Sequence, residues 1–158
     1  MKTNICLDHI SYCQFNDEAI KEINRISLLD NMPDVSITSF SPSPEHLKIN
    51  TSVFNPSVLD QFYDGLVIAH TITNANNILG CATNSLKVLY LYDLDWMFKQ
   101  MTYSYIYSTL SDKNLHIILR SKEHIEPLQC LCNKQITGVI DKFNLEDIWN
   151  LLSKTKTK

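Results

Sequence analysis

Five apolar segments of the sequence are each followed directly by polar, chemically capable side chains. A histidine or an aspartate in such a place can take a proton from a substrate hydroxyl, and arginine or serine can hold polar groups of a substrate. We therefore predict His70 and Asp93 as catalytic residues. The predicted substrate-binding residues are Asp8, His9, Thr71, Asp95, Arg120 and Ser121, and Asp141 and Lys142 follow the fifth segment.

The apolar segments have the length and composition of buried strands and alternate with helical patterns. Strands are predicted at 4–10, 34–40, 65–69, 86–97, 115–121 and 136–143, with a short edge strand within 48–54 and a helical turn within 56–62. Helices are predicted from an N-cap at Asn16 or Asp17, then at 74–82, 103–110, 122–132 and 145–154. This alternation indicates an α/β fold: a doubly wound, Rossmann-like, mainly parallel sheet of about six strands flanked by helices.

Parallel strands end at one edge of their sheet, and ligands of such folds bind beyond that edge. The predicted site residues, although far apart in the sequence, are therefore expected on a common rim. A structural interpretation stays open, because any strand that leaves a core must meet water. His70 could cap the following helix or pair with Asp93, and Asp93 could cap a turn.

Several site classes are excluded by the absence of their motifs. The chain has three glycines and none between the first strand and the first helix, which excludes a P-loop and a dinucleotide-binding fingerprint. No GxSxG, HExxH or zinc quartet occurs. A divalent ion could be held only if the tips of Asp8, His9, His70, Asp93 and Asp95 converge. We predict neither a metal nor a cofactor.

Length and composition indicate one domain, residues 1–153, followed by a basic tail at 154–158. A net charge of −3 argues against nucleic-acid binding. The five cysteines are scattered and form no CxxC pair, so they are interpreted as buried free thiols. No leader or long apolar run is evident, and we expect a cytoplasmic protein with no membrane span.

Four segments in order resemble the second half of the N-terminal Rossmann-like domain of GT-B glycosyltransferases. They are "DGLVIAHTITNANNILG", "LKVLYLYDLDWM", "LHIILRSKEHIEPLQ" and "ITGVIDKFNLEDI", which together span 64–148. The pieces that match the family's pattern are Ala69–Thr71, Tyr92–Trp96, Arg120–Ser121 and Gly138–Asn144. The loop after the first strand departs from the family because it reads "DHISYCQFND", without glycine.

The resemblance implies the acceptor-side half of a sugar-transfer system. In that family a second domain binds the sugar nucleotide, and no such domain follows here, so a separate donor-binding glycosyltransferase chain is the expected partner. Carried over by position, His70 would face the cleft, Asp93 and Asp95 would lie in the neighbouring loop, and Arg120 and Ser121 would line the same rim. An aspartate or His70 would be the base in a hexosyl transfer.

Two other functions remain open. The aromatic segment Trp96–Tyr107 favours a non-catalytic assembly or protein-binding module derived from a glycosyltransferase, with a homodimer as one form. Half-buried packing on an amphipathic helix would also explain these aromatic residues. A flavodoxin-like or receiver-like domain is the third option, but only Asp8 is suitably placed for a receiver's acidic residues.

Overall fold

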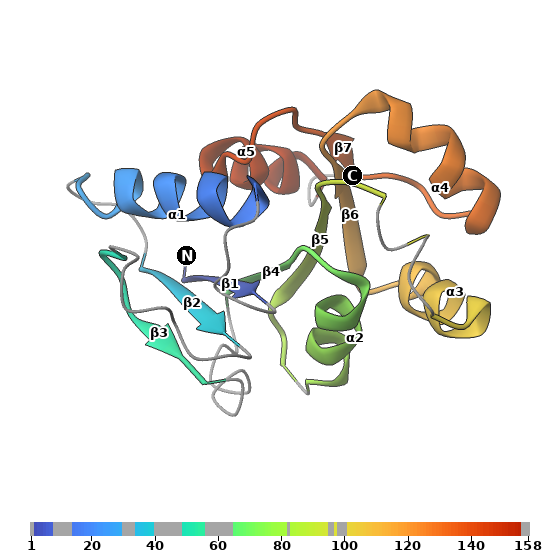
Figure 1. The fold of residues 1–158 in the computed structure, drawn as a ribbon, viewed down its shortest axis with the longest axis horizontal. Coiled ribbons are helices and arrows are strands. Elements are labelled where there is room, and N and C mark those ends of the chain that lie inside the picture. The colour runs from blue at the N-terminus through green and yellow to red at the C-terminus, as the bar shows by residue number, and fades with distance from the viewer. Residues whose placement is uncertain are drawn as a thin grey trace.

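A single parallel sheet forms the centre of the molecule (Figure 1). The computed structural model describes residues 2–7, 14–29, 34–39, 49–55, 65–81, 83–94, 97 and 101–155. The sheet has seven strands in the order β3-β2-β1-β4-β5-β6-β7, and every pairing is parallel. The strands are β1 (Thr3–Leu7), β2 (Val35–Ser39), β3 (Val53–Phe54), β4 (Leu66–Ala69), β5 (Leu86–Leu91), β6 (Leu115–Leu119) and β7 (Gly138–Val139).

Helices cover both faces of this sheet, which confirms the predicted doubly wound α/β fold (Figure 1). They are α1 (Gln14–Ile26), α2 (Ile72–Gly80), α3 (Tyr103–Ser111), α4 (Ile125–Leu131) and α5 (Leu145–Thr155), and a 3₁₀-helix, η3 (Lys122–His124), precedes α4. One core lies beneath α1 and α5 and contains Ile68, whereas the other lies beneath α2, α3 and α4 and contains Ala69. Consecutive strand residues point to opposite faces, so β4 supplies both cores.

Helix α1 begins at Gln14, so the predicted N-cap at Asn16 or Asp17 is wrong. The apolar residues of the helix recur every three or four positions, and these residues face the sheet. Phe15 belongs to this face and is buried. Helical structure over the first turn brings the Phe15 ring into the aromatic part of the core.

Pairing limits the length of the strands. β5 ends at Leu91, the residue opposite Leu119 of β6, and does not extend to Met97 as predicted. β7 pairs only with β6 and is two residues long. The short edge strand predicted within 48–54 is confirmed as β3, whereas the turn predicted within 56–62 lies outside the described residues.

The prediction that the cysteines are buried holds for only part of the set. Cys6 and Cys132 are buried, Cys81 is half-buried, and Cys130 is exposed. The prediction is wrong for Cys130 because this residue lies two positions before Cys132 and so points to another side of α4. Cys13 lies outside the described residues.

No helix in the described part of the chain is long and apolar enough to cross a membrane. The last helix, α5, continues to Thr155, so the first two residues of the predicted basic tail are helical.

Glu22 of α1 joins this helix to the start of α5. One of its carboxylate oxygens accepts a hydrogen bond from the backbone N–H of Leu145 at 3.0 Å. Both oxygens also accept from Arg25, at 2.8 and 3.1 Å. These bonds, together with a contact from Glu146, raise the pKa of Arg25. Glu22 is buried, so its carboxylate depends on these partners.

Replacement of Glu22 by Ala should destabilise the protein by about 1–3 kcal/mol, because it leaves a buried N–H of α5 without an acceptor. Urea unfolding would measure the change. Glu146→Ala is the matched control: it removes only a half-exposed ion pair with Arg25, and its effect should be about 0–1 kcal/mol. Equal effects of the two substitutions would contradict this role of Glu22.

Candidate functional site

The parallel strands bring the predicted site residues to one edge of the sheet. His70 and Thr71 follow β4, Asp93 lies two residues beyond β5, and Arg120 and Ser121 follow β6. β4 ends at Ala69, immediately before His70, and it is paired with β1 on one side and with β5 on the other. Asp8, His9 and Asp95 lie outside the described residues, so their assignment to this edge stays a prediction.

The edge contains the point where the strand order reverses. β1 has β2 on one side and β4 on the other, and the helices that follow β1 and β4 lie on opposite faces of the sheet. In doubly wound folds this arrangement leaves a crevice between the two strand ends, where ligands bind. His70 follows β4 directly and therefore lies at this reversal of the strand order.

The ring of His70 is fixed by two contacts. Its Nδ1 lies 3.1 Å from the backbone oxygen of Cys6, and its ring stacks on Phe15 with centroids 4.4 Å apart and planes 13° apart. A carbonyl oxygen can only accept, so we assign the proton to Nδ1. In the neutral ring Nε2 then carries the lone pair, which is the state required of a base.

Asn74 shares the same acceptor as His70. Its Nδ2 donates to the oxygen of Cys6 at 3.3 Å, and its side chain is fully buried. Its Oδ1 has no hydrogen-bond partner among the described residues. Asn74 itself is placed by Thr71, which caps α2 and accepts from the N–H of Asn74 at 3.1 Å. Thr71 and Asn74, at the start of α2, thus help to hold the end of β1 in its place beside His70.

A second group on this edge joins α1 to β5 and β6. The hydroxyl of Tyr92 donates to Oε1 of Glu18 at 2.8 Å, and Nη2 of Arg120 lies 3.9 Å from the same oxygen. The guanidinium of Arg120 also lies 4.1 Å from the centre of the Tyr92 ring. The other oxygen of Glu18 is buried and finds no hydrogen-bond partner within the described ranges.

Alternation along the strands explains why these side chains meet. Ile68, Tyr90 and Ile118 all belong to the core beneath α1 and α5. Two residues further along each chain come His70, Tyr92 and Arg120, and a side chain two positions on returns to the same face. These three residues therefore lie on the α1 side of the edge, where they contact α1 through Phe15 and Glu18.

The remaining predicted residues are used differently. Ser121 caps η3 by accepting from the N–H of Glu123 at 3.2 Å, as Thr71 caps α2. Asp93 is exposed. Capping of helices thus accounts for the hydroxyls of Thr71 and Ser121 without a substrate, and their contact with a substrate stays a prediction.

Among the described residues, no three His, Cys, Asp or Glu side chains gather as metal ligands would.

Glu18 and Tyr92 were not among the predicted site residues. The sequence contains a partial signal for Glu18, since acidic residues stand near the start of the first predicted helix. Tyr92 continues the apolar run of β5 and gives no separate signal. Their hydrogen bond connects residues 74 positions apart, and only the packing of α1 on the sheet reveals it.

Burial, followed by the hydrogen bond to Glu18, raises the pKa of Tyr92 to about 12. An unfolded tyrosine ionises near pH 10. The neutral phenol of Tyr92 therefore contributes stability that is fully present below about pH 10 and is lost as the pH rises to about 12. Unfolding free energies measured across this range should decrease, and Tyr92→Phe should reduce the slope. An unchanged slope in Tyr92→Phe would contradict the role of this hydroxyl.

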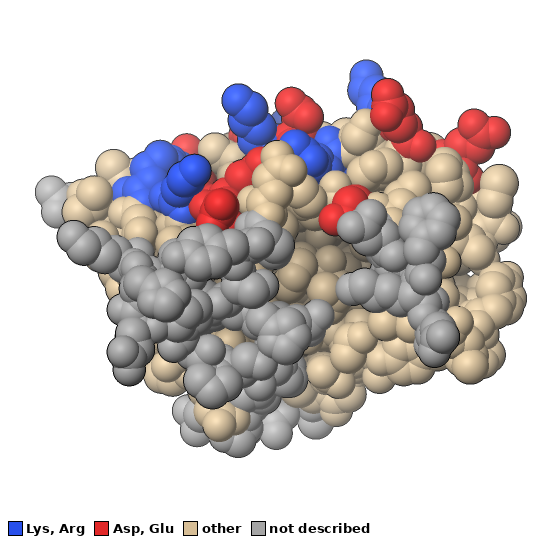
Figure 2. All heavy atoms as spheres, in the orientation of Figure 1, with Lys and Arg blue, Asp and Glu red and all other residues tan. Residues whose placement is uncertain are grey.

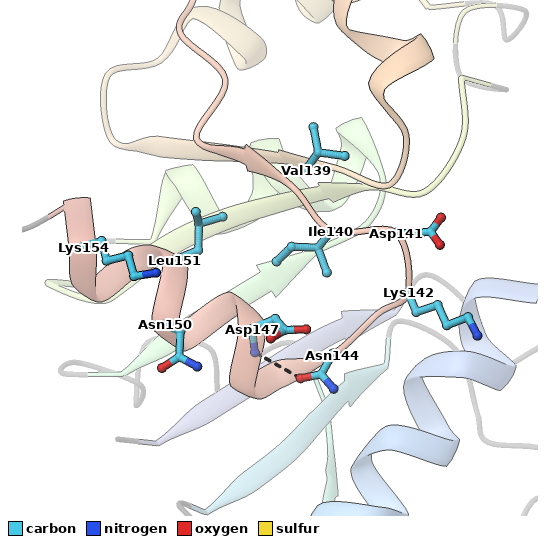
Figure 3. A pocket seen from close by; sticks show the side chains of 9 residues that line it. All are labelled: Val139, Ile140, Asp141, Lys142, Asn144, Asp147, Asn150, Leu151 and Lys154. Atoms are coloured by element: carbon cyan, nitrogen blue, oxygen red, sulfur yellow. Dashed lines mark hydrogen bonds between the residues drawn. The ribbon is translucent and has the colours of Figure 1, made fainter.

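An open groove of about 690 Å³ lies between β7 and α5 (Figure 3). Its apolar floor includes Ile140 and Leu151, and Asp141 lies at the rim. Asp141 and Lys142, which follow the fifth apolar segment, line it, whereas His70, Arg120 and Ser121 do not. β5 and β6 stand between β4 and β7, so the groove is roughly 14 Å from the strand that ends at His70. The groove therefore lies away from His70, although the backbone oxygen of Asp141 at its rim accepts a hydrogen bond from Nε of Arg120 at 3.4 Å.

The candidate site thus consists of the fixed histidine beside the strand reversal and, next to it, the group formed by Glu18, Tyr92 and Arg120. It combines an imidazole with groups that can form hydrogen bonds to hydroxyls.

Comparisons with models of protein families, with curated protein sequences and with solved structures find no match to this chain.

Proposed function

We propose that the protein supplies the acceptor side of a glycosyl transfer, in which a separate chain binds the sugar nucleotide. The observation that carries the proposal is the state of His70: its Nδ1 faces the carbonyl of Cys6, so Nε2 is the basic nitrogen. The histidine also stands beside the strand reversal, where Rossmann-like folds bind their ligands.

In the proposed reaction, Nε2 of His70 removes the proton of an acceptor hydroxyl. The electron pair of the O–H bond forms the new bond from the acceptor oxygen to the anomeric carbon of the donor sugar. The bond from that carbon to the nucleoside diphosphate breaks, and the diphosphate leaves with its electron pair. His70 suits the role of base better than Asp93 because its ring is held in place, whereas Asp93 is exposed.

Glu18, Tyr92 and Arg120 would bind the acceptor. Arg120, about one-third exposed, can donate to a hydroxyl of the acceptor, and Glu18, whose Oε1 contacts both Tyr92 and Arg120, holds these two side chains at the edge. An acceptor rich in hydroxyls fits this mixture of a carboxylate and a guanidinium better than an apolar acceptor does.

The test has two parts. Native purification from the source cells should recover a second α/β chain with this one. The two chains together should then release nucleoside diphosphate from uridine or guanosine diphosphate hexoses in the presence of a sugar acceptor. Recovery without a partner would overturn the proposal. So would a co-purified chain with which no diphosphate is released.

A second candidate is a non-catalytic assembly module, and the exposure of Tyr103 and Tyr107 on α3 favours it. Such a module would keep its partner when His70 is replaced, and it would release no diphosphate. Measuring diphosphate release by the wild-type complex beside the His70→Gln complex separates the two functions, because only a transferase releases diphosphate in its wild-type form.

A further inference from the structure

Helices α2 and α3 present a surface without charge. Neither Ile72–Gly80 nor Tyr103–Ser111 contains an aspartate, glutamate, lysine or arginine. In Figure 2 the charged side chains gather along the top of the view, over α1, α5 and α4, and the described atoms over α2 and α3 are uncharged. The outward residues define what we call the α2–α3 surface: Thr73, Asn77, Tyr103, Ser104, Tyr107 and Ser108, all exposed.

The two helices form one continuous surface. They lie side by side, and the buried hydroxyl of Thr109 on α3 donates to Oδ1 of Asn76 on α2 at 3.4 Å. This packing fixes the positions of the two helices relative to each other. The exposed residues of both helices can therefore meet a partner together.

Two tyrosines stand out from this surface. Tyr103 and Tyr107 are 60% and 46% exposed, and their ring centres lie 5.9 Å apart with planes 25° apart. The hydroxyl of Tyr103 donates to the backbone oxygen of Leu131 at 3.3 Å, which restrains its ring. A ring that is already restrained loses little freedom when a partner covers it, and tyrosine is enriched at contact surfaces for that reason.

The chemistry of the surface suits contact with itself. Hydroxyls and side-chain amides both donate and accept hydrogen bonds, so a surface of Asn, Ser, Thr and Tyr can pair with an identical surface. Carboxylates or ammonium groups placed against their own kind would repel each other. The chain has a net charge of −3, and pairing through α2 and α3 keeps the charged helices of the two copies apart.

We propose that two copies of this chain associate through the α2–α3 surface in a dimer with two-fold symmetry. In such a dimer the same residues face each other from both copies. Each helix has nine residues and is roughly 13 Å long, so the contact belongs to the small class of interfaces. The dimer is therefore reversible and forms as the protein concentration rises.

The experiment follows the mass of the full chain by sedimentation over a wide concentration range. One triple variant carries Ser104→Glu, Tyr107→Glu and Ser108→Glu, and a second carries lysine at the same three positions. Each variant alone should remain a monomer at concentrations where the wild type is a dimer. An equimolar mixture of the two variants should form a dimer again, because opposite charges then face each other, and added salt should weaken this mixed dimer.

Leu28→Glu is the matched control. Leu28 is 76% exposed and follows α1, which covers the opposite face of the sheet from α2 and α3, so its replacement should leave the dimer unchanged. Circular dichroism checks that each variant is folded. A wild type that stays monomeric at every concentration would overturn the proposal. So would dimers that persist in the folded triple variants, or a mixture that stays monomeric, since the surface would then not face its own copy.

Discussion

Replacement of His70 by Gln should lower the rate of the proposed sugar transfer about 10²–10⁴-fold, the usual contribution of a general base. Glutamine keeps a side chain that can donate to the oxygen of Cys6, but it offers no basic nitrogen. The loss should therefore appear in kcat more than in KM.

His116→Gln is the matched control. His116 is half-buried in β6, near the start of the strand and away from the edge where the strands end. Its replacement should leave kcat unchanged. A His70→Gln enzyme that keeps the wild-type rate would show that His70 is not the base, and Asp93 would then be the remaining predicted candidate.

Replacement of Gly65 by Ala should destabilise the protein by about 3 kcal/mol or more, a large part of the 5–15 kcal/mol that holds an ordinary domain together. A Cβ at this position would lie 2.5 Å from the backbone oxygen of Lys2. The same oxygen accepts from the N–H of Leu66 at 2.8 Å, where β1 and β4 come together. The clash is with backbone, so no side-chain rotation can relieve it, and the central pair of strands must separate.

Gly80→Ala provides the control for this substitution. A Cβ at Gly80 would meet no atom within 4 Å, and Gly80 is the last residue of α2. Alanine there should stabilise the protein by about 0.5–1 kcal/mol, because it lowers the entropy of the unfolded chain. Urea unfolding of the two variants should therefore show opposite shifts of the midpoint. A stable Gly65→Ala protein would mean that β1 and β4 are further apart than described.

The sheet was predictable because its signal is local. β4, β5 and β6 are mainly apolar runs of four to six residues, and these runs alternate with helical patterns. These two observations are enough to predict parallel strands, and hence a common edge for His70, Asp93 and Arg120. The place of the strand reversal between β1 and β4 is not local, since it depends on which strands pair.

The partners of the site residues could not be read from the sequence. The contact of Arg120 with Tyr92 requires that Leu91 pairs with Leu119, and no local pattern encodes this register. The contact with Glu18 further requires that α1 packs on this face of the sheet, which no local pattern encodes either. The caps had a recognisable signal, because Thr71 and Ser121 each stand directly before a helix.

The indole N–H of Trp149 in α5 donates to the hydroxyl of Thr3 in β1 at 3.1 Å, so an element made last touches one made first. During translation, β1, β4 and β5 therefore emerge from the ribosome before α5, which together with α1 covers one face of these strands. Until α5 has been made, α1 is the only one of the described helices that covers this apolar face, and partly covered surfaces of this kind on a nascent chain are prone to aggregation.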